Sequence, residues 1–161
     1  MRKQRCVQCA GHMVAHQEDY PYRSLPGVVL QGLTVWRCQG CDAHEVDVPD
    51  PEGLHRALVN ELVRKRERLA PSEIRFLRKY LGYSSKEFAE HIGVSPETVS
   101  RWETGAQSMA PVADRLVRLM ALTKEPVGDY IDTMDKVGRL DVRPYEGKLR
   151  RLGNTGWETA V

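Results

Sequence analysis

Apolar positions recur at helical spacing through the second half of the chain. Ile74, Leu77 and Leu81 share one face of a predicted helix that ends at Gly82. Two later segments repeat the period, with apolar positions at Val112, Leu116, Leu119 and Met120, then at Val127, Tyr130, Ile131, Met134 and Val137. We interpret the last stripe as core, and a dimer seam is the alternative.

Between these segments the sequence predicts two shorter helices with a stop or start signal at each end. Ser84 can accept an orphan backbone amide, and Glu87, three residues later, completes a capping box. Gly93 favours the left-handed conformation that ends a helix. Ser95 caps the second helix and Gly105 ends it. The stretch from 83 to 105 is therefore predicted to be helix, tight turn, helix.

The second short helix has an apolar and a polar side, because Val99 and Trp102 can point inward while its polar residues point outward. In a helix-turn-helix the second helix enters the DNA major groove and its N-terminal residues reach base edges. The segment resembles the Xre/Cro-like family, in which a Gly-Val-Ser turn leads to Ser-Arg-Trp-Glu-x-Gly. A generic helical hairpin is the alternative. The expected DNA-contacting residues are Ser84, Ser85, Ser95, Glu97, Thr98, Ser100, Arg101 and Gln107.

These candidates have different expected roles. The Arg101 guanidinium can pair bidentately with guanine or with phosphate. Glu97 can accept a hydrogen bond from cytosine, or it simply favours the helix dipole. Ser84 and Ser85 lie where backbone amides position a phosphate, and Gln107 can hold phosphate on the other side.

The first 50 residues show the composition of β-strands. The segments 28–30 and 33–36 are rich in β-branched and apolar residues, Gly27 and Gly32 punctuate them, and 45–48 alternates as a half-buried strand does. We expect a small sheet whose core is too small to fold without a metal.

All four cysteines lie in this part, as two C-x2-C pairs: Cys6 with Cys9, and Cys38 with Cys41. Two such knuckles form a tetrahedral thiolate site, which suits one structural Zn²⁺. Four thiolates leave no open position for water, so catalysis at this zinc is not expected. Buried or disulfide-linked pairs are the alternative. His12, His16 and His44 are interpreted as surface residues rather than ligands.

A linker and connecting helix are expected over 51–70. Prolines interrupt 49–53, and leucines then recur at helical spacing. Basic residues late in this helix complement its dipole, and a phosphate-facing or partner-facing patch is the alternative. They are Arg64, Lys65, Arg66 and Arg68.

The tail over 139–161 is polar and basic. It could be an arm that touches phosphates, a strand that docks on the first domain, or a segment that binds a partner. Partial disorder is preferred.

Composition is that of a globular protein, with 161 residues, 41% hydrophobic residues and a net charge of +2. No apolar run approaches the roughly 20 residues of a membrane span, and no signal peptide is recognised. We expect a cytoplasmic protein with reduced cysteines. No HExxH, nucleophilic triad or phosphate-binding loop is present, so an enzyme is not expected.

The predicted fold class is α+β: a β-rich four-cysteine module over 1–50, then an all-α five-helix domain over 71–138. This order, both C-x2-C pairs and the segment from Gly93 to Gly105 resemble the MqsA/YgiT antitoxin family. Glu97 stands where that family carries an asparagine.

The resemblance implies a structural zinc, a homodimer that binds a palindromic operator in double-stranded DNA, repression of its own operon, and a toxin protein as partner. The alternative is a stand-alone Xre-type transcription factor whose zinc module binds another partner.

Overall fold

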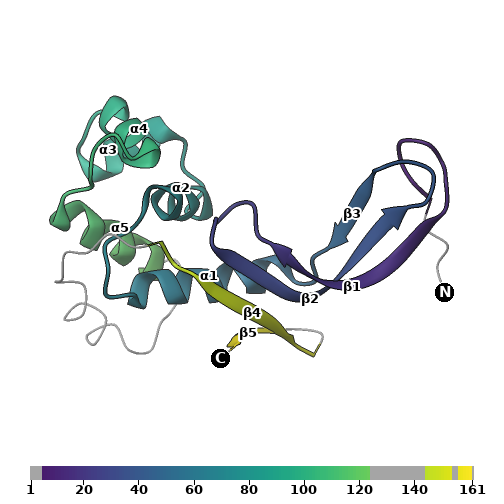
Figure 1. Ribbon diagram of the computed structural model, residues 1–161. Coiled ribbons are helices and arrows are strands. Elements are labelled where there is room, and N and C mark those ends of the chain that lie inside the picture. Colours follow the sequence, from purple (N-terminus) through teal and green to yellow (C-terminus); the bar gives the residue numbers. More distant parts are fainter. Residues whose placement is uncertain (1–4, 124–143, 154–155, 161) are drawn as a thin grey trace.

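The computed structural model describes residues 5–123, 144–153 and 156–160, where the chain forms a five-stranded sheet and five helices (Figure 1). The expected α+β layout, a β-rich first part followed by helices, is confirmed. The last predicted helix, which carries the apolar stripe from Val127 to Val137, lies outside the described residues. The elements are β1 (Met13–Pro21), β2 (Val28–Cys38), β3 (His44–Asp47), α1 (Pro51–Arg64), α2 (Pro71–Tyr80), α3 (Ser85–Ile92), α4 (Pro96–Thr104), α5 (Pro111–Thr123), β4 (Gly147–Leu152) and β5 (Gly156–Ala160).

Strand β2 is the centre of the sheet. One edge pairs antiparallel with β1 along most of its length. The other edge is shared: residues 28–31 pair with β4 in parallel, and residues 34–37 pair antiparallel with β3. Strand β5 then pairs antiparallel with β4. The sheet therefore unites both ends of the chain.

The C-terminal strands differ from the partial disorder preferred for the tail. Of the three placements considered, the structure has the strand that docks on the first domain, since β4 pairs with β2. The approach requires Gly27, which has φ 95°, because a Cβ there would lie 2.9 Å from the Tyr145 carbonyl oxygen. Leu149 is fully buried, and the Trp157 indole N–H donates to the Asp50 carbonyl (3.3 Å).

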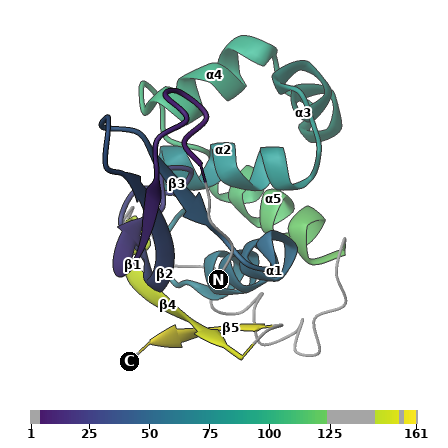
Figure 2. The same ribbon diagram turned by 90° about the vertical axis from the view of Figure 1, so that its right-hand side faces the viewer.

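Helix α1 connects the sheet to the helical part. The side chain of Asp50 caps it by accepting from the Gly53 amide (3.0 Å). Figure 2 shows α2, α3 and α4 on one side of α1 and the strands β4 and β5 on the other. One continuous hydrophobic cluster includes Leu30 and Leu149 from the sheet, Leu58 from α1 and Val117 from α5. The base of the sheet and the helices therefore share a core.

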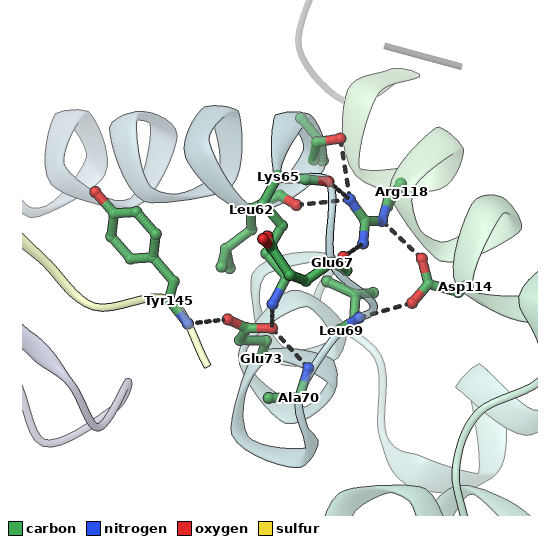
Figure 3. A network of polar contacts seen from close by, with 10 residues as sticks. Leu62, Lys65, Glu67, Leu69, Ala70, Glu73, Asp114, Arg118 and Tyr145 are labelled. Carbon is green, nitrogen blue, oxygen red and sulfur yellow. Dashed lines mark hydrogen bonds and ion pairs between the residues drawn. The ribbon is translucent and has the colours of Figure 1, made fainter. Parts of the chain in front are cut away.

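A buried arginine ties α5 to the chain between α1 and α2 (Figure 3). Arg118, 1% exposed, donates to the Asp114 carboxylate (2.7 Å) and to backbone carbonyls that include those of Lys65 (2.7 Å) and Glu67 (2.6 Å). Asp114 also accepts from the Leu69 amide (2.7 Å). The guanidinium thus satisfies carbonyls where α1 has ended, which is a C-cap supplied by another helix.

A buried glutamate makes a second tie (Figure 3). Glu73, 0% exposed, accepts from the Lys65 ammonium, the Ala70 amide and the Tyr145 amide, each at 2.6 Å. Because Tyr145 leads into β4, Glu73 joins α2 to the C-terminal strands. Part of the basic run after α1 is therefore structural: Lys65 pairs with Glu73, and Arg68 donates to the Met109 carbonyl (3.4 Å).

The half of the sheet that carries the cysteines projects away from the shared core (Figure 1). Met13 and Val35 are buried there but lie outside the main hydrophobic cluster. We call this projection, residues 5–18 and 34–47, the cysteine arm. Within the described residues, no helix is long and apolar enough to cross a membrane.

Candidate nucleic-acid interface and metal site

Helix α3 has the predicted capping box. The Ser84 hydroxyl accepts from the Glu87 amide (3.2 Å), and the Glu87 carboxylate accepts from the Ser84 amide (2.8 Å). The hydroxyl and the amide of Ser84 lower the pKa of Glu87. The carboxylate therefore stays ionised near neutral pH, beside the positive end of the helix dipole. Ser84 is exposed and Ser85 is partly exposed at this helix start.

Helix α4 follows after the tight turn, as predicted. Gly93 (φ 76°) and Gly105 (φ 80°) adopt left-handed conformations at the ends of α3 and α4. The Ser95 hydroxyl accepts from the Thr98 amide (3.3 Å). Val99 and Trp102 are buried, at 0% and 3% exposure. The two caps and the inward residues therefore set which side of α4 faces solvent.

The outward side of α4 presents a small charged and polar surface. Glu97, Ser100 and Arg101 are exposed, as are Ser95 at the helix start and Gln107 in the loop that follows, while Thr98 is half-buried. The pKa of Glu97 is lowered by the backbone amide of Glu97 itself and, to a smaller extent, by the Ser95 hydroxyl and the nearby charge of Arg101. Glu97 is thus an anion that can accept hydrogen bonds and that repels phosphate.

The predicted DNA-contacting residues therefore lie at the start of α3, on the outward side of α4 and in the loop after it. We call the exposed or partly exposed set the α3–α4 face, comprising Ser84, Ser85, Ser95, Glu97, Thr98, Ser100, Arg101 and Gln107.

A buried carboxylate fixes α4 on α2. It lies within the motif, but sequence reasoning assigned it no role. Glu103, with its side chain 7% exposed, accepts from Arg78 Nε (2.5 Å) and Nη2 (3.1 Å) and from Arg75 Nε (3.3 Å). Arg78 also donates to the Tyr83 carbonyl (2.9 Å) between α2 and α3. One buried carboxylate thus sets the position of α4 relative to α2. The sequence signal that could have revealed this contact was the glutamate of the motif, which stands between Trp102 and Gly105.

The four cysteines form one cluster at the end of the cysteine arm. All four sulfur atoms lie within 4.8 Å of one another. Cys6 and Cys41 are 3.6 Å apart at Sγ, and Cys9 and Cys38 are 3.4 Å apart. A Zn–S distance of about 2.3 Å places the sulfurs of a tetrahedral site about 3.8 Å apart. The donor set can therefore hold a metal ion without a large rearrangement, and the cysteines are not disulfide-bonded.

Local backbone supports this cluster. The Gln8 amide donates to Cys6 Sγ (3.4 Å) and the Gly40 amide to Cys38 Sγ (3.3 Å), the same contact in each C-x2-C turn. A Cβ on Gly11 would lie 3.1 Å from Cys9 Sγ, so a side chain there would crowd the sulfurs.

Charge also favours a cation at this point. The Gly40 amide, opposed in part by burial, lowers the pKa of Cys38 to about 7. The pKa of Cys41 is raised to about 12: the Ala43 amide lowers it, but the neighbouring sulfurs of Cys9 and Cys6 and burial outweigh that effect. Four thiolates this close repel one another unless a cation lies between them.

The histidines of the arm are not part of this cluster. His12, His16 and His44 are exposed, and the metal-binding group found in the described residues contains cysteines alone. The His44 ring lies 3.4 Å from the Tyr20 hydroxyl instead. With four sulfur ligands the coordination sphere is closed.

Comparison with known families agrees with the helical part. A family model described as helix-turn-helix matches residues 74–128, about a third of the chain, from within α2 to beyond α5. This is an Xre-type DNA-binding domain of regulators and not an enzyme family. No curated protein matches the chain. The resemblance to MqsA/YgiT antitoxins is not confirmed by these comparisons.

Proposed function

We propose that the chain is a sequence-specific transcriptional regulator that binds double-stranded DNA through the α3–α4 face. The observation that carries the proposal is the capped α3–turn–α4 unit, with Val99 and Trp102 buried and Arg101 exposed. Helix α4 enters the major groove, and the amides at the start of α3 hold a phosphate. One such unit covers a half-site, so a homodimer on a palindromic operator is the expected assembly.

The residues of the α3–α4 face have distinct roles in this proposal. Arg101 pairs with guanine, and the Glu97 carboxylate accepts from a cytosine amino group. Ser95, Thr98 and Ser100 complete the contacts of α4 with the groove. Ser84, Ser85 and Gln107 position the backbone on either side.

We further propose that Cys6, Cys9, Cys38 and Cys41 hold one structural Zn²⁺. An all-sulfur tetrahedral donor set suits this ion, and its sulfur spacing is close to that of a zinc site. When bound, the ion supplies folding free energy to the arm. The buried apolar residues of the arm, such as Met13 and Val35, lie outside the shared core, so the arm has only a small core of its own.

Within this function we propose the antitoxin role: the arm binds a toxin and the helical domain represses the operon. The support is the resemblance of the sequence together with the layout, in which the arm projects away from α3 and α4 (Figure 1). A protein bound at the end of the arm leaves the α3–α4 face open. A stand-alone regulator with another partner on its arm is the alternative.

The DNA proposal is tested by selecting bound duplexes from a random library and measuring the affinity of the recovered site. Arg101→Ala should weaken binding to that site by about 1–3 kcal/mol, roughly 5- to 150-fold, without changing the melting temperature. Arg37→Ala, an exposed arginine on β2 in the cysteine arm, is the matched control. Equal affinity of the Arg101 variant and wild type would remove Arg101 from the interface.

The zinc proposal is tested by Cys38→Ser. Metal content should fall from one Zn²⁺ per chain to near zero, and amide protection should be lost in the arm but kept in α2–α5. Ser24→Ala, a change of similar size away from the cluster, is the control. A variant that lacks zinc yet keeps full protection in the arm would contradict a structural metal.

The antitoxin role is tested by purifying the tagged full chain from its native cells and identifying what stays bound. A small stoichiometric protein that is encoded beside it, and is toxic when expressed alone, is the expected partner. Recovery of the chain alone, or with DNA only, would favour the stand-alone regulator.

A further inference from the structure

A cleft of about 470 Å³ lies between the connection of β1 to β2 and the helices α1 and α2. Its walls come from three elements: the β1–β2 connection, α1 and α2. The principal lining residues are Tyr22, His55, Arg56, Phe76, Lys79 and Tyr80. The volume is within the range of about 300–1,000 Å³ that is typical of small-molecule sites. Neither the metal site nor the α3–α4 face includes this cleft.

One side of the cleft is a cluster of rings with fixed orientation. The Tyr22 hydroxyl lies 2.8 Å from His55 Nε2, and the His55 and Phe76 rings form a T-shaped pair with centroids 5.7 Å apart. Burial lowers the pKa of His55, so its imidazole is neutral at pH 7. These rings form an apolar wall suited to contact an aromatic ring.

The remaining lining has an excess of positive charge. Arg56 and Lys79 line the cleft, and Glu52 is the one carboxylate there. Arg23 lies on an adjoining hollow that shares Lys79 with the cleft. In the described part of the chain, Arg23, Arg56 and Lys79 form no ion pair, whereas Arg75 beside them pairs with Glu103. Unpaired cations around a partly enclosed space attract an anion.

We propose that this cleft binds a small aromatic anion: one ring that packs on the wall of Phe76, Tyr22 and His55, and a carboxylate or phosphate group held by Arg56 and Lys79. Arginine suits both anionic groups because its guanidinium pairs with them bidentately. The limited volume and the ring-lined wall favour a small molecule over an acidic protein segment.

The cleft also has a direct mechanical link to DNA binding, which rests on the proposed function. Helix α2 carries Phe76 and Lys79 into the cleft and carries Arg75 and Arg78 to Glu103 on α4. A ligand that shifts α2 therefore shifts the recognition helix. The cleft is placed to bind an effector that changes operator affinity.

The test measures binding to the full-length, metal-loaded protein without DNA, so it is independent of the DNA-binding proposal. The probes are benzoate and phenyl phosphate. Their binding is measured by titration calorimetry and by the NMR signals of the His55 ring protons. Both should saturate the protein with Kd on the order of 1 mM, as expected for ligands of this size. Inorganic phosphate, which lacks the ring, and benzyl alcohol, which lacks the charge, should bind at least about tenfold more weakly.

Two variants locate the site. Lys79→Ala and Arg56→Ala, both at exposed positions, should each weaken the probes on the order of tenfold while the melting temperature stays unchanged. Lys86→Ala, an exposed lysine on α3 outside the cleft, is the matched control.

Three outcomes overturn the proposal: no saturable binding up to about 10 mM, a limit well above the expected Kd; equal binding of inorganic phosphate and phenyl phosphate; or probe binding that Lys79→Ala leaves unchanged. If the probes fail and Lys79→Ala instead releases a co-purifying protein, the surface is a protein interface and the small-anion proposal is wrong.

Discussion

Replacement of Arg118 by methionine tests whether the buried polar network holds α5 against the chain between α1 and α2. Arg118 is 1% exposed and Asp114 is 2% exposed, so neither charge has water as an alternative partner. The change removes the ion pair with Asp114 and the donors to the Lys65 and Glu67 carbonyls. Methionine has a similar length and fills most of the space, so the lost term is polar rather than a cavity.

The expected loss is about 3–5 kcal/mol, because removing one partner leaves an uncompensated buried charge on Asp114. Against a total stability of about 5–15 kcal/mol, this is a large fraction, and it corresponds to a drop of about 10 °C in melting temperature. The double variant Asp114→Asn with Arg118→Met should lose less than the sum of the two single losses, since it leaves no lone charge.

The assay is urea unfolding followed by far-UV circular dichroism, with Arg115→Met as the control. Arg115 lies on the same helix but is exposed, so its replacement should change stability by less than about 0.5 kcal/mol. If Arg118→Met and Arg115→Met unfold at the same urea concentration, the network does not stabilise the junction and the reasoning is refuted.

Two further predictions concern α2 and the cleft. Glu103→Gln should lower stability by about 2 kcal/mol, because it strips the charged partner from Arg78, which is 11% exposed. Arg75→Ala, which removes the 49% exposed partner, should cost less than about 1 kcal/mol; equal losses in urea unfolding would contradict this ranking. For His55, whose pKa is lowered by burial, the neutral form is favoured in the folded state. The free energy of unfolding should therefore keep its full value above the unfolded pKa of about 6.5, and it should fall as the pH drops through the lower folded pKa. His55→Gln should flatten that part of the melting-temperature profile, and an unchanged slope would show that another group titrates.

The helix-turn-helix could be predicted in detail because its determinants are local. Ser84 and Glu87 are three residues apart, and the capping box they form needs only that spacing. Gly93 sits where the chain must turn with positive φ. The spacing of the cysteines likewise predicted two knuckles, and the structure brings all four sulfurs together.

Contacts between distant residues could not be read from the sequence in the same way. Glu73 resembles an ordinary acidic residue in a first helical turn, yet it is fully buried and joins α2 to Tyr145. The basic run after α1 resembles a solvated surface, yet Lys65 points at Glu73. Long-range pairs such as these leave no periodicity, because either partner alone looks like a surface charge.

The sequence by itself determined the local units: the capped helices, the outward side of α4 and the two cysteine turns, since each depends on residues a few positions apart. Only the tertiary structure decided that the tail forms β4 and β5, and that β4 lies beside β2. The strands of the tail are short and polar. Leu149 and Trp157 are buried only because residues of the first strands and of α1 pack against them. The cleft between the β1–β2 connection, α1 and α2 was likewise decided only by the tertiary structure, because its rings and cations come from segments that meet only in the folded chain.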